Sequence, residues 1–312
     1  MSRVLLLFPG QGSQAVGMGR SVWETFPVSR AVFHEAEDLL GWDLRGLCMN
    51  GPLSELTRTD KAQPAIFACS VATWRVLEQA GFDFSVAAGH SLGEYSALVA
   101  TGQVDFADAL RVVEARGRAM WECGQRKPGA MAAIMGVGDE DVDAVCSEVG
   151  EVWPANYNCP GQVVISGTPR GVESACKLAL ERGARRALPL QVSGAFHSPL
   201  VAEAAGPLRQ ALERVRFVAP VRGRFFSTTE LRYPEPDEIG ETLVRQLTSP
   251  VRFTQSMRGL LPELEVGVEV GPGGVLAGLV KRVSSGFSVY GTDGAVPLDE
   301  VLVLLNGKGG SQ

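Results

Sequence analysis

Hydrophobic positions divide the chain into short apolar runs and longer stretches of helical periodicity. Apolar runs with the length of buried strands lie at residues 3–8, 86–88 and 266–270. Apolar residues recur at helical spacing in four further stretches, at residues 21–40, 63–79, 105–123 and 275–283. Strands that alternate with helices in this way predict an α/β fold built on a parallel sheet.

The pattern changes between residues 129 and 192, where the predicted elements are shorter. They follow the order strand, helix, strand, strand, helix, strand, at residues 130–135, 139–149, 152–156, 162–166, 170–182 and 186–192. This βαββαβ order is typical of ferredoxin-like domains. We therefore expect a small ferredoxin-like domain, residues 128–193, inserted into a large α/β-hydrolase-like domain of residues 1–127 and 194–312. The glycine-rich residues 306–312 are expected to form a flexible tail.

Composition and charge narrow the class of protein further. The 312 residues are 45% hydrophobic and 21% charged, which is ordinary for a globular protein, and the net charge of −6 argues against nucleic acid as the main partner. The first apolar run is too short for a signal sequence and no later run approaches a membrane span. Six cysteines without a C-x-x-C pair predict reduced thiols rather than disulfides or a metal site. We expect a cytoplasmic protein without a metal.

The hexapeptide Gly89-His90-Ser91-Leu92-Gly93-Glu94 lies between a predicted strand and a helical run. A sharp strand-to-helix turn needs glycines on both sides of its central serine, because larger side chains would collide there. Such a turn presents the serine hydroxyl to a cleft and directs the first amides of the helix towards an oxyanion. The pattern predicts that Ser91 becomes acylated. A glycine-rich turn without chemistry is the alternative that this motif alone leaves open.

An acylated serine usually requires a base, and the chain contains three histidines. His34 lies in an amphipathic stretch and is expected at the surface. His90 precedes Ser91 directly, so an extended strand would direct it to the opposite face. His197 remains, on a predicted loop after the small domain. No carboxylate is close to it in sequence, so either a distant acid or a carbonyl oxygen would orient it.

Arg116 falls within the apolar stripe of its predicted helix, between Val112 and Met120 at helical spacing. A guanidinium on a buried face stays charged and requires an anionic partner. One alternative is an internal ion pair with a carboxylate from another element, which is the more common arrangement. The other is that Arg116 binds the carboxylate of a substrate in a bidentate contact.

The glycines that follow the first strand, Gly10 and Gly12, superficially match a dinucleotide-binding fingerprint. Pro9 interrupts the junction, and no acidic residue ends a second strand about 20 residues further on. A loop that offers a backbone amide to an oxyanion, with Gln11 as the donor, fits these residues better.

Taken together, these motifs resemble the malonyl-CoA:acyl carrier protein transacylases of fatty acid synthesis and the related acyltransferase domains of polyketide synthases. The resemblance covers nearly the whole chain. The matching segments, in order, are Phe8 to Gln14, Gly89 to Glu94, Arg116-Gly117, Asn156 to Gln162, Gly194 to Pro199, Ser249-Pro250-Val251 and Glu269 to Gly273.

The resemblance implies a role for each of several residues. Ser91 would carry the malonyl ester, with His197 as general base and acid. The backbone amides of Gln11 and Leu92 would form the oxyanion hole, and Arg116 would bind the malonyl carboxylate. A main-chain carbonyl orients the histidine in this family, and Gln246 matches that position. Phenylalanine beside the histidine accompanies malonyl selection in the synthase domains, so Phe196 would exclude an α-methyl group.

The activity implied by the resemblance is ping-pong transfer of malonyl from malonyl-CoA to the phosphopantetheine thiol of acyl carrier protein. The enzyme would need no cofactor of its own and would act as a monomer. A trans-acting acyltransferase of a polyketide pathway would look alike in sequence. A hydrolase of acyl thioesters would use the same Ser91 and His197. A non-catalytic protein that docks acyl carrier protein would leave Ser91, His197 and Arg116 unexplained.

Overall fold

The computed structural model describes residues 3–192, 194–293, 298, 301 and 303. In chain order the elements are β1 (Val4–Phe8), α1 (Arg20–Thr25), α2 (Pro27–Leu40), α3 (Leu44–Asn50), α4 (Leu53–Leu56), α5 (Thr59–Gln79), β2 (Val86–Gly89), α6 (Gly93–Ala100), α7 (Phe106–Arg126), β3 (Ala130–Met135), α8 (Asp139–Val149), β4 (Val152–Cys159), β5 (Gln162–Gly167), α9 (Pro169–Glu181), β6 (Arg186–Pro189), η1 (Pro199–Ala204), α10 (Ala205–Leu212), β7 (Arg224–Phe226), α11 (Ile239–Gln246), α12 (Phe253–Leu260), η2 (Leu261–Glu263), β8 (Val266–Glu269), α13 (Val275–Val283) and β9 (Val289–Gly291). The predicted tail, residues 306–312, lies outside the described residues.

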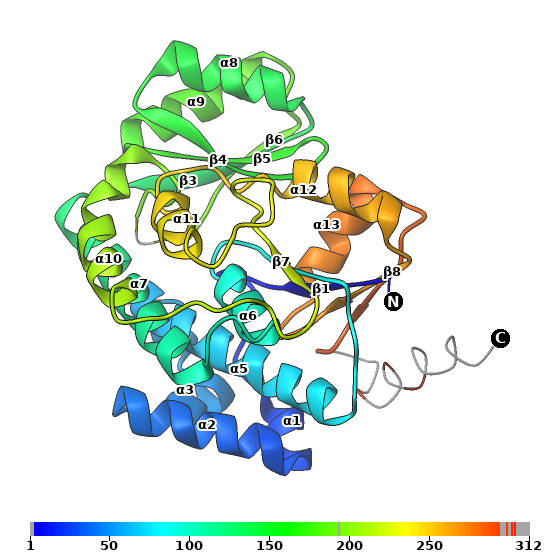
Figure 1. The fold of residues 1–312 in the computed structure, drawn as a ribbon. Helices are drawn as coiled ribbons and strands as arrows, with labels where there is room; N and C mark the ends of the chain where they lie inside the picture. The colour runs from blue at the N-terminus through cyan, green and yellow to red at the C-terminus, as the bar shows by residue number, and fades with distance from the viewer. Residues whose placement is uncertain (1–2, 193, 294–297, 299–300, 302, 304–312) are drawn as a thin grey trace.

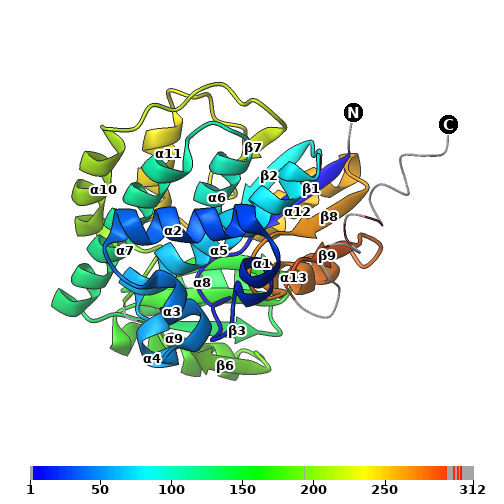
Figure 2. The ribbon, with the colours of Figure 1, turned by 90° about the horizontal axis from the view of Figure 1, so that it is seen from below.

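The larger sheet is parallel, as predicted. Within the described residues its strand order is β7-β2-β1-β8-β9. Leu6 of β1 packs into a core shared with α2, α5, α6 and α7, whereas its neighbours Leu5 and Leu7 pack towards α12 and α13. Strands covered on both faces in this way appear as continuous apolar runs, which explains the sequence of β1. Figure 1 shows β1 and β8 between these two groups of helices, and Figure 2, seen from below, shows α2 and α5 side by side.

The smaller sheet, drawn in green in Figure 1, is antiparallel, with strand order β4-β5-β3-β6 in the described part of the chain. Helices α8 and α9 pack on one of its faces around a separate apolar core. The order β3-α8-β4-β5-α9-β6 agrees with the order expected from the sequence. The strand β4 extends to Cys159, three residues beyond the expected end, because Pro160 and Gly161 alone make the turn to β5.

The two sheets are joined by backbone hydrogen bonds next to the candidate site. Asn156 of β4 forms an isolated parallel bridge with Val251, which follows α11. The amide of Tyr157 donates to the Val251 carbonyl at 2.9 Å, and the Val251 amide donates to the Ala155 carbonyl at 2.9 Å. The small sheet therefore holds in place the segment that directly follows Gln246.

Two predicted helices differ most from the structure, in each case near a proline. The expected helix of residues 21–40 is broken into α1 and α2, because Phe26 is extended and Pro27 begins the second helix. The helix α5 begins at Thr59 rather than at residue 63 and carries Pro64 in its interior. Proline marks helix starts more often than interiors, so the sequence favoured the later start.

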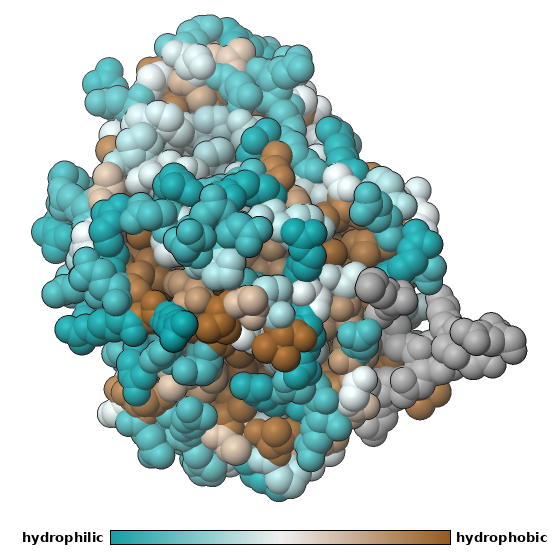
Figure 3. All heavy atoms as spheres, viewed as in Figure 1, coloured by the Kyte–Doolittle hydropathy of each residue, from teal (hydrophilic) through white to brown (hydrophobic). Residues whose placement is uncertain are grey.

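Features of the surface and of the cysteines complete the fold. Figure 3 shows hydrophilic side chains over most of one face, with apolar groups scattered between them. All six cysteines are free thiols, as predicted, and five of them are buried. Over the part of the chain that the structure describes, none of the helices combines the length and the hydrophobicity that a bilayer span requires.

Candidate active site

Ser91 lies at a sharp turn between β2 and α6, in a left-handed conformation with φ of 52°. Both flanking glycines are required sterically. A Cβ atom at Gly89 would lie 1.9 Å from the carbonyl carbon of Gly93, and one at Gly93 would lie 2.0 Å from the carbonyl oxygen of Phe8. The turn therefore has the geometry that the G-x-S-x-G spacing predicts, with the serine side chain on the wall of a cavity.

His197 contacts Ser91, as the elimination of the other histidines predicts. Its Nε2 atom lies 2.9 Å from Ser91 Oγ. Its Nδ1 atom lies 2.9 Å from the carbonyl oxygen of Gln246 and 3.1 Å from that of Ser249. Carbonyl oxygens only accept, so Nδ1 carries the proton and Nε2 is free to accept one from the serine. Of the two arrangements left open by the sequence, the structure has orientation by carbonyl oxygens.

The electrostatic environment favours the neutral form of His197. Burial lowers the pKa of its imidazole to about 3, and the positive charge of Arg116 acts in the same direction. The side chain is only 5% exposed. At neutral pH the ring is therefore neutral and its unprotonated Nε2 faces a hydroxyl, which is the state required of a general base.

Arg116, on α7, is 1% exposed and reaches the same serine. Its Nη2 atom donates to Ser91 Oγ at 2.9 Å and to Gln246 Oε1 at 3.0 Å, and its Nη1 atom donates to Gln63 Oε1 at 2.7 Å. These three acceptors are neutral, and no ion pair joins Arg116 to a carboxylate within the described ranges. The internal ion pair considered from the sequence is therefore absent there. A buried cation without an ionic partner can bind an anionic ligand.

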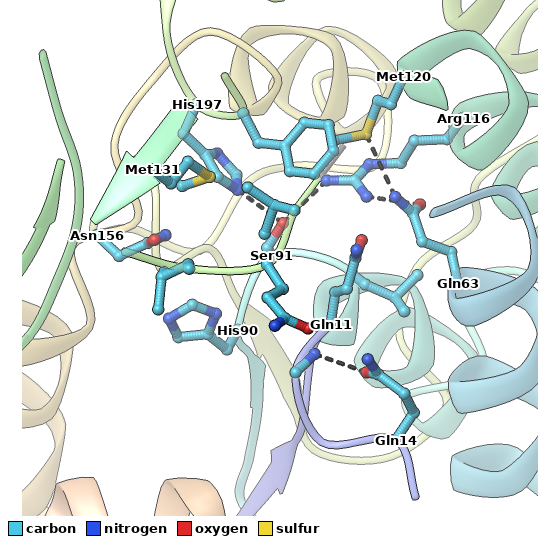
Figure 4. A pocket seen from close by; sticks show the side chains of 16 residues that line it. Gln11, Gln14, Gln63, His90, Ser91, Arg116, Met120, Met131, Asn156 and His197 are labelled. Carbon is cyan, nitrogen blue, oxygen red and sulfur yellow. Dashed lines mark hydrogen bonds between the residues drawn. The ribbon is translucent and has the colours of Figure 1, made fainter. Parts of the chain in front are cut away.

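A cavity of about 270 Å³ separates the elbow from the small sheet, and Figure 4 shows Ser91, His197 and Arg116 together on its wall. The loop after β1 contributes Gln11 to the lining, and the small sheet contributes Met131 and Asn156. The cavity therefore lies between the loops of the large sheet and the small sheet. Among the described residues no group of His, Cys, Asp and Glu side chains could hold a metal ion.

The remaining predicted residues lie around the same cavity. Gln11, Leu92 and Phe196 all contribute to its lining, and Phe196 is 6% exposed. The side-chain Nε2 of Gln11 donates to Thr59 Oγ1 at 3.2 Å, which fixes the loop after β1 against α5. Donation from the Gln11 and Leu92 amides to an oxyanion stays a prediction.

His90 points away from Ser91, as expected from the alternation of a strand. Its ring packs on Phe253 of α12, with ring centroids 5.8 Å apart, whereas Ser91 contacts Arg116 of α7. The Nε2 atom of His90 lies 2.9 Å from Asn158 Oδ1 in β4, and the residue still contributes to the lining of the cavity.

Two functional features were missed in the sequence. The side chain of Gln246, and not only its carbonyl, belongs to the site, because its Nε2 donates to Ser91 O at 3.1 Å and to Glu94 Oε2 at 2.6 Å. Glu94 is fully buried in α6, all of whose residues are buried. A carboxylate within an otherwise apolar helix, three residues after the serine, was the available signal.

Comparison with known proteins defines first the class and then the family. A sequence model described as "Acyl transferase domain" matches residues 5–290. The malonyl CoA-acyl carrier protein transacylases of Bacillus subtilis (strain 168) and Escherichia coli (strain K12) are each 44% identical to the chain, and each match covers 91% of the chain. The matches cover 91% of the Bacillus protein and 93% of the Escherichia protein. The chain therefore belongs to the malonyl CoA-acyl carrier protein transacylase family.

Solved structures agree with this membership. An acyl carrier protein S-malonyltransferase from Vibrio cholerae has a TM-score of 0.91 at 42% identity, covering 96% of this chain and 100% of that chain. A malonyl-transacylase in complex with a type II polyketide synthase acyl-carrier protein has a TM-score of 0.93 at 41% identity, covering 97% of this chain and 100% of that chain.

Proposed function

We propose that this enzyme transfers the malonyl group of malonyl-CoA to the phosphopantetheine thiol of an acyl carrier protein, through a malonyl ester on Ser91. The observation that carries the proposal is a buried Arg116 without a carboxylate partner, hydrogen-bonded to the same Ser91 Oγ that contacts His197. Ser91 and His197 provide the nucleophile and the base for acyl transfer. The guanidinium of Arg116, which has no ionic partner among the described residues, would bind an acyl group that carries a free carboxylate.

In the first half-reaction Ser91 gives its hydroxyl proton to Nε2 of His197 while Oγ attacks the thioester carbonyl. The backbone amides of Gln11 and Leu92 stabilise the oxyanion of the tetrahedral intermediate. The carbon–sulfur bond then breaks, His197 returns its proton to the sulfur of coenzyme A, and the malonyl ester remains on Ser91. The carbonyls of Gln246 and Ser249 hold the imidazole in the required tautomer and stabilise its transient positive charge.

In the second half-reaction the thiol of the carrier's phosphopantetheine enters the same cavity. It gives its proton to His197 and attacks the ester carbonyl, and the ester bond to Ser91 breaks as Oγ takes the proton back. Water must be kept from the ester between the two steps. The chain's transacylase relatives favour transfer over the hydrolytic alternative.

Two residues select the acyl group in this scheme. Arg116 binds the malonyl carboxylate through a charge-assisted contact. Phe196, buried beside His197 on the cavity wall, restricts the space around the α-carbon and disfavours methylmalonyl.

The proposal extends to the organisation of the molecule. We propose that residues 128–193 are an inserted ferredoxin-like domain and that residues 1–127 and 194–312 form the α/β-hydrolase-like catalytic domain. The strand order β4-β5-β3-β6, with α8 and α9 on one face, supports the first assignment. The enzyme requires no cofactor of its own in this scheme and acts as a monomer in the cytoplasm.

The decisive experiment is intact-mass analysis after brief exposure to malonyl-CoA, followed by a chase with holo acyl carrier protein. We expect a malonyl adduct that persists in buffer, moves to the carrier, and is absent from a Ser91→Ala variant. An adduct that water removes before the carrier does would identify a hydrolase. The absence of any adduct on the wild-type protein would refute the proposed substrate.

A further inference from the structure

Glu94 is a buried carboxylate that the mechanism above does not use. It lies in the first turn of α6 and is fully inaccessible to solvent. Its Oε1 accepts from the backbone N–H of Thr228 at 2.7 Å, and its Oε2 accepts from Nε2 of Gln246 at 2.6 Å. The hydroxyls of Thr228 and Ser227 lie 2.9 and 3.3 Å from Oε1. A charge in such a position is costly unless it is satisfied, and here both oxygens face donors.

The orientation of the Gln246 amide follows from its neighbours. Its two N–H groups donate to Glu94 Oε2 and to the carbonyl oxygen of Ser91, while its Oε1 accepts from Nη2 of Arg116. A flipped amide would direct N–H groups at the guanidinium and its oxygen at the carboxylate. Glu94 and the Ser91 carbonyl together therefore determine that Gln246 presents its oxygen to Arg116.

We infer that Glu94 is the counter-charge of Arg116, held one amide group away, and is thus a positioning residue for malonyl selection. Gln246 transmits the interaction, because it accepts from the guanidinium on one side and donates to the carboxylate on the other. A direct ion pair would occupy the guanidinium that the substrate carboxylate needs. With the amide of Gln246 between them, Glu94 balances the charge of Arg116 while the guanidinium stays free to bind the substrate carboxylate. This inference rests on the proposed function.

The charges around Arg116 support this arrangement. Burial lowers the pKa of the Arg116 guanidinium, and interactions with Tyr95 and Glu94 oppose that effect. Burial raises the pKa of Tyr95 to about 12, so its hydroxyl is neutral near pH 7. Burial also raises the pKa of Glu94, to about 7, against the effect of its hydrogen-bond donors. Of the two groups, Glu94 is the one that carries negative charge as the pH rises past neutrality.

The same residue links the counter-charge to the base. The main-chain carbonyl of Gln246 accepts from Nδ1 of His197, while its side chain connects Arg116 to Glu94. Glu94 therefore acts on Arg116 through a side chain whose backbone also orients His197. A change at Glu94 should affect acylation by malonyl more than acylation by an uncharged acyl group, because only malonyl presents a carboxylate to Arg116.

The first test is the substitution Glu94→Gln. An amide at position 94 carries no charge and has one acceptor oxygen where Glu94 has two, so a donor–donor contact arises either with the Thr228 N–H or with the Gln246 amide that links to Arg116. We expect the kcat/KM of Ser91 acylation by malonyl-CoA to fall about 10- to 100-fold more than that by acetyl-CoA, the effect of losing a hydrogen bond to a charged group. Acylation by each thioester is followed by intact mass.

The second test is the exchange Glu94→Gln/Gln246→Glu. The exchange restores the donor–acceptor order from Thr228 to Arg116 but loses the N–H that Gln246 donates to the Ser91 carbonyl, so the thermal midpoint should recover in part relative to Glu94→Gln. It also brings the carboxylate into direct contact with Arg116, where it competes with malonyl. The malonyl-to-acetyl ratio should therefore stay at least about tenfold below that of the wild type. If the single variant does not fold, this variant carries the test.

The matched control is Glu269→Gln, which alters another fully buried carboxylate that accepts backbone N–H bonds away from the cavity. It should lower the thermal midpoint without changing the malonyl-to-acetyl ratio. The inference is overturned if the exchange restores that ratio to the wild-type value, or if Glu94→Gln lowers both substrates equally. Wild-type protein that forms no malonyl ester would instead refute the proposed function, so the two failures are distinguishable.

Discussion

Replacing Arg116 by alanine removes the positive charge next to Ser91 while leaving the Ser91–His197 contact in place. Truncating one partner of a buried, hydrogen-bonded charge pair costs about 2–5 kcal/mol. At 1.36 kcal/mol for each factor of ten, kcat/KM for acylation by malonyl-CoA should fall about 30- to several thousand-fold. An acetyl group lacks the carboxylate, so its acylation loses only the hydrogen bond from the charged Arg116 to Ser91 Oγ, about 1.5–3 kcal/mol or about 10- to 160-fold.

The assay follows Ser91 acylation by intact mass on a time course with each thioester, and the ratio of the two kcat/KM values is the measured quantity. This ratio is insensitive to partial unfolding, because inactive protein lowers both rates equally. Arg118→Ala is the matched control, since Arg118 lies on the exposed side of the same helix. If Arg116→Ala lowers malonyl and acetyl transfer in equal proportion, Arg116 does not bind the substrate carboxylate and the proposed selection is refuted.

Four further predictions concern the geometry of the site and of α13. The substitution His197→Ala should slow malonyl-ester formation about 10²- to 10⁴-fold, as measured by intact mass, and an effect below tenfold would contradict its role as base. Burial holds the pKa of His197 at about 3 against an ordinary value of 6.5, so its imidazole NMR signals, assigned with His197→Ala, should not titrate between pH 8 and 5. The unfolded ring takes up a proton near pH 6.5 and the folded ring does not, so the contribution of His197 to the free energy of unfolding falls as the pH drops from 6.5 towards 3. An NMR titration midpoint near 6.5 for His197 in the folded protein would contradict this. The substitution Phe196→Ser should raise the ratio of methylmalonyl to malonyl ester about tenfold or more, the value of one methyl group in a tight pocket, and an unchanged ratio would remove Phe196 from selection. Glu269→Gln should lower the free energy of unfolding by about 1–3 kcal/mol in urea titrations, because the carboxylate accepts the N–H bonds of Leu276 and Ala277 at the start of α13; unchanged stability would show that those bonds are dispensable.

Local patterns in the sequence predicted several elements with their correct bounds. The strand Ala130–Met135 and the helices Asp139–Val149 and Val275–Val283 agree with the structure residue for residue. Each is a periodic or apolar run bounded by glycine or by acidic residues, so local preference and tertiary packing agree. The break at Phe26 was missed although Pro27 is a local signal for the start of a helix. The early start of α5 was missed because its packing against α2 and α7 overrides the local preference of Pro64.

Ser91, His197 and Arg116 could each be singled out by residue type and spacing, since glycines around a serine, a loop histidine and an arginine on an apolar stripe are local signals. The distances between these three side chains could not be predicted, because 106 residues separate Ser91 from His197 and 25 residues separate Ser91 from Arg116. The same holds for Gln246, which lies 152 residues from Glu94. A side chain's partner across such a separation depends on the packing of whole elements.

The sequence by itself thus determined the α/β class, the elbow at Ser91 and the candidate chemistry, because these depend on backbone sterics and on the periodicity of burial. Only the tertiary structure decided that carbonyl oxygens rather than an acid orient His197, that Arg116 has no ionic partner among the described residues, and that Glu94 reaches it through Gln246. Hydrogen bonds and charge balance in a buried site depend on which donors and acceptors the folded chain brings within about 3 Å, and sequence spacing does not encode that distance.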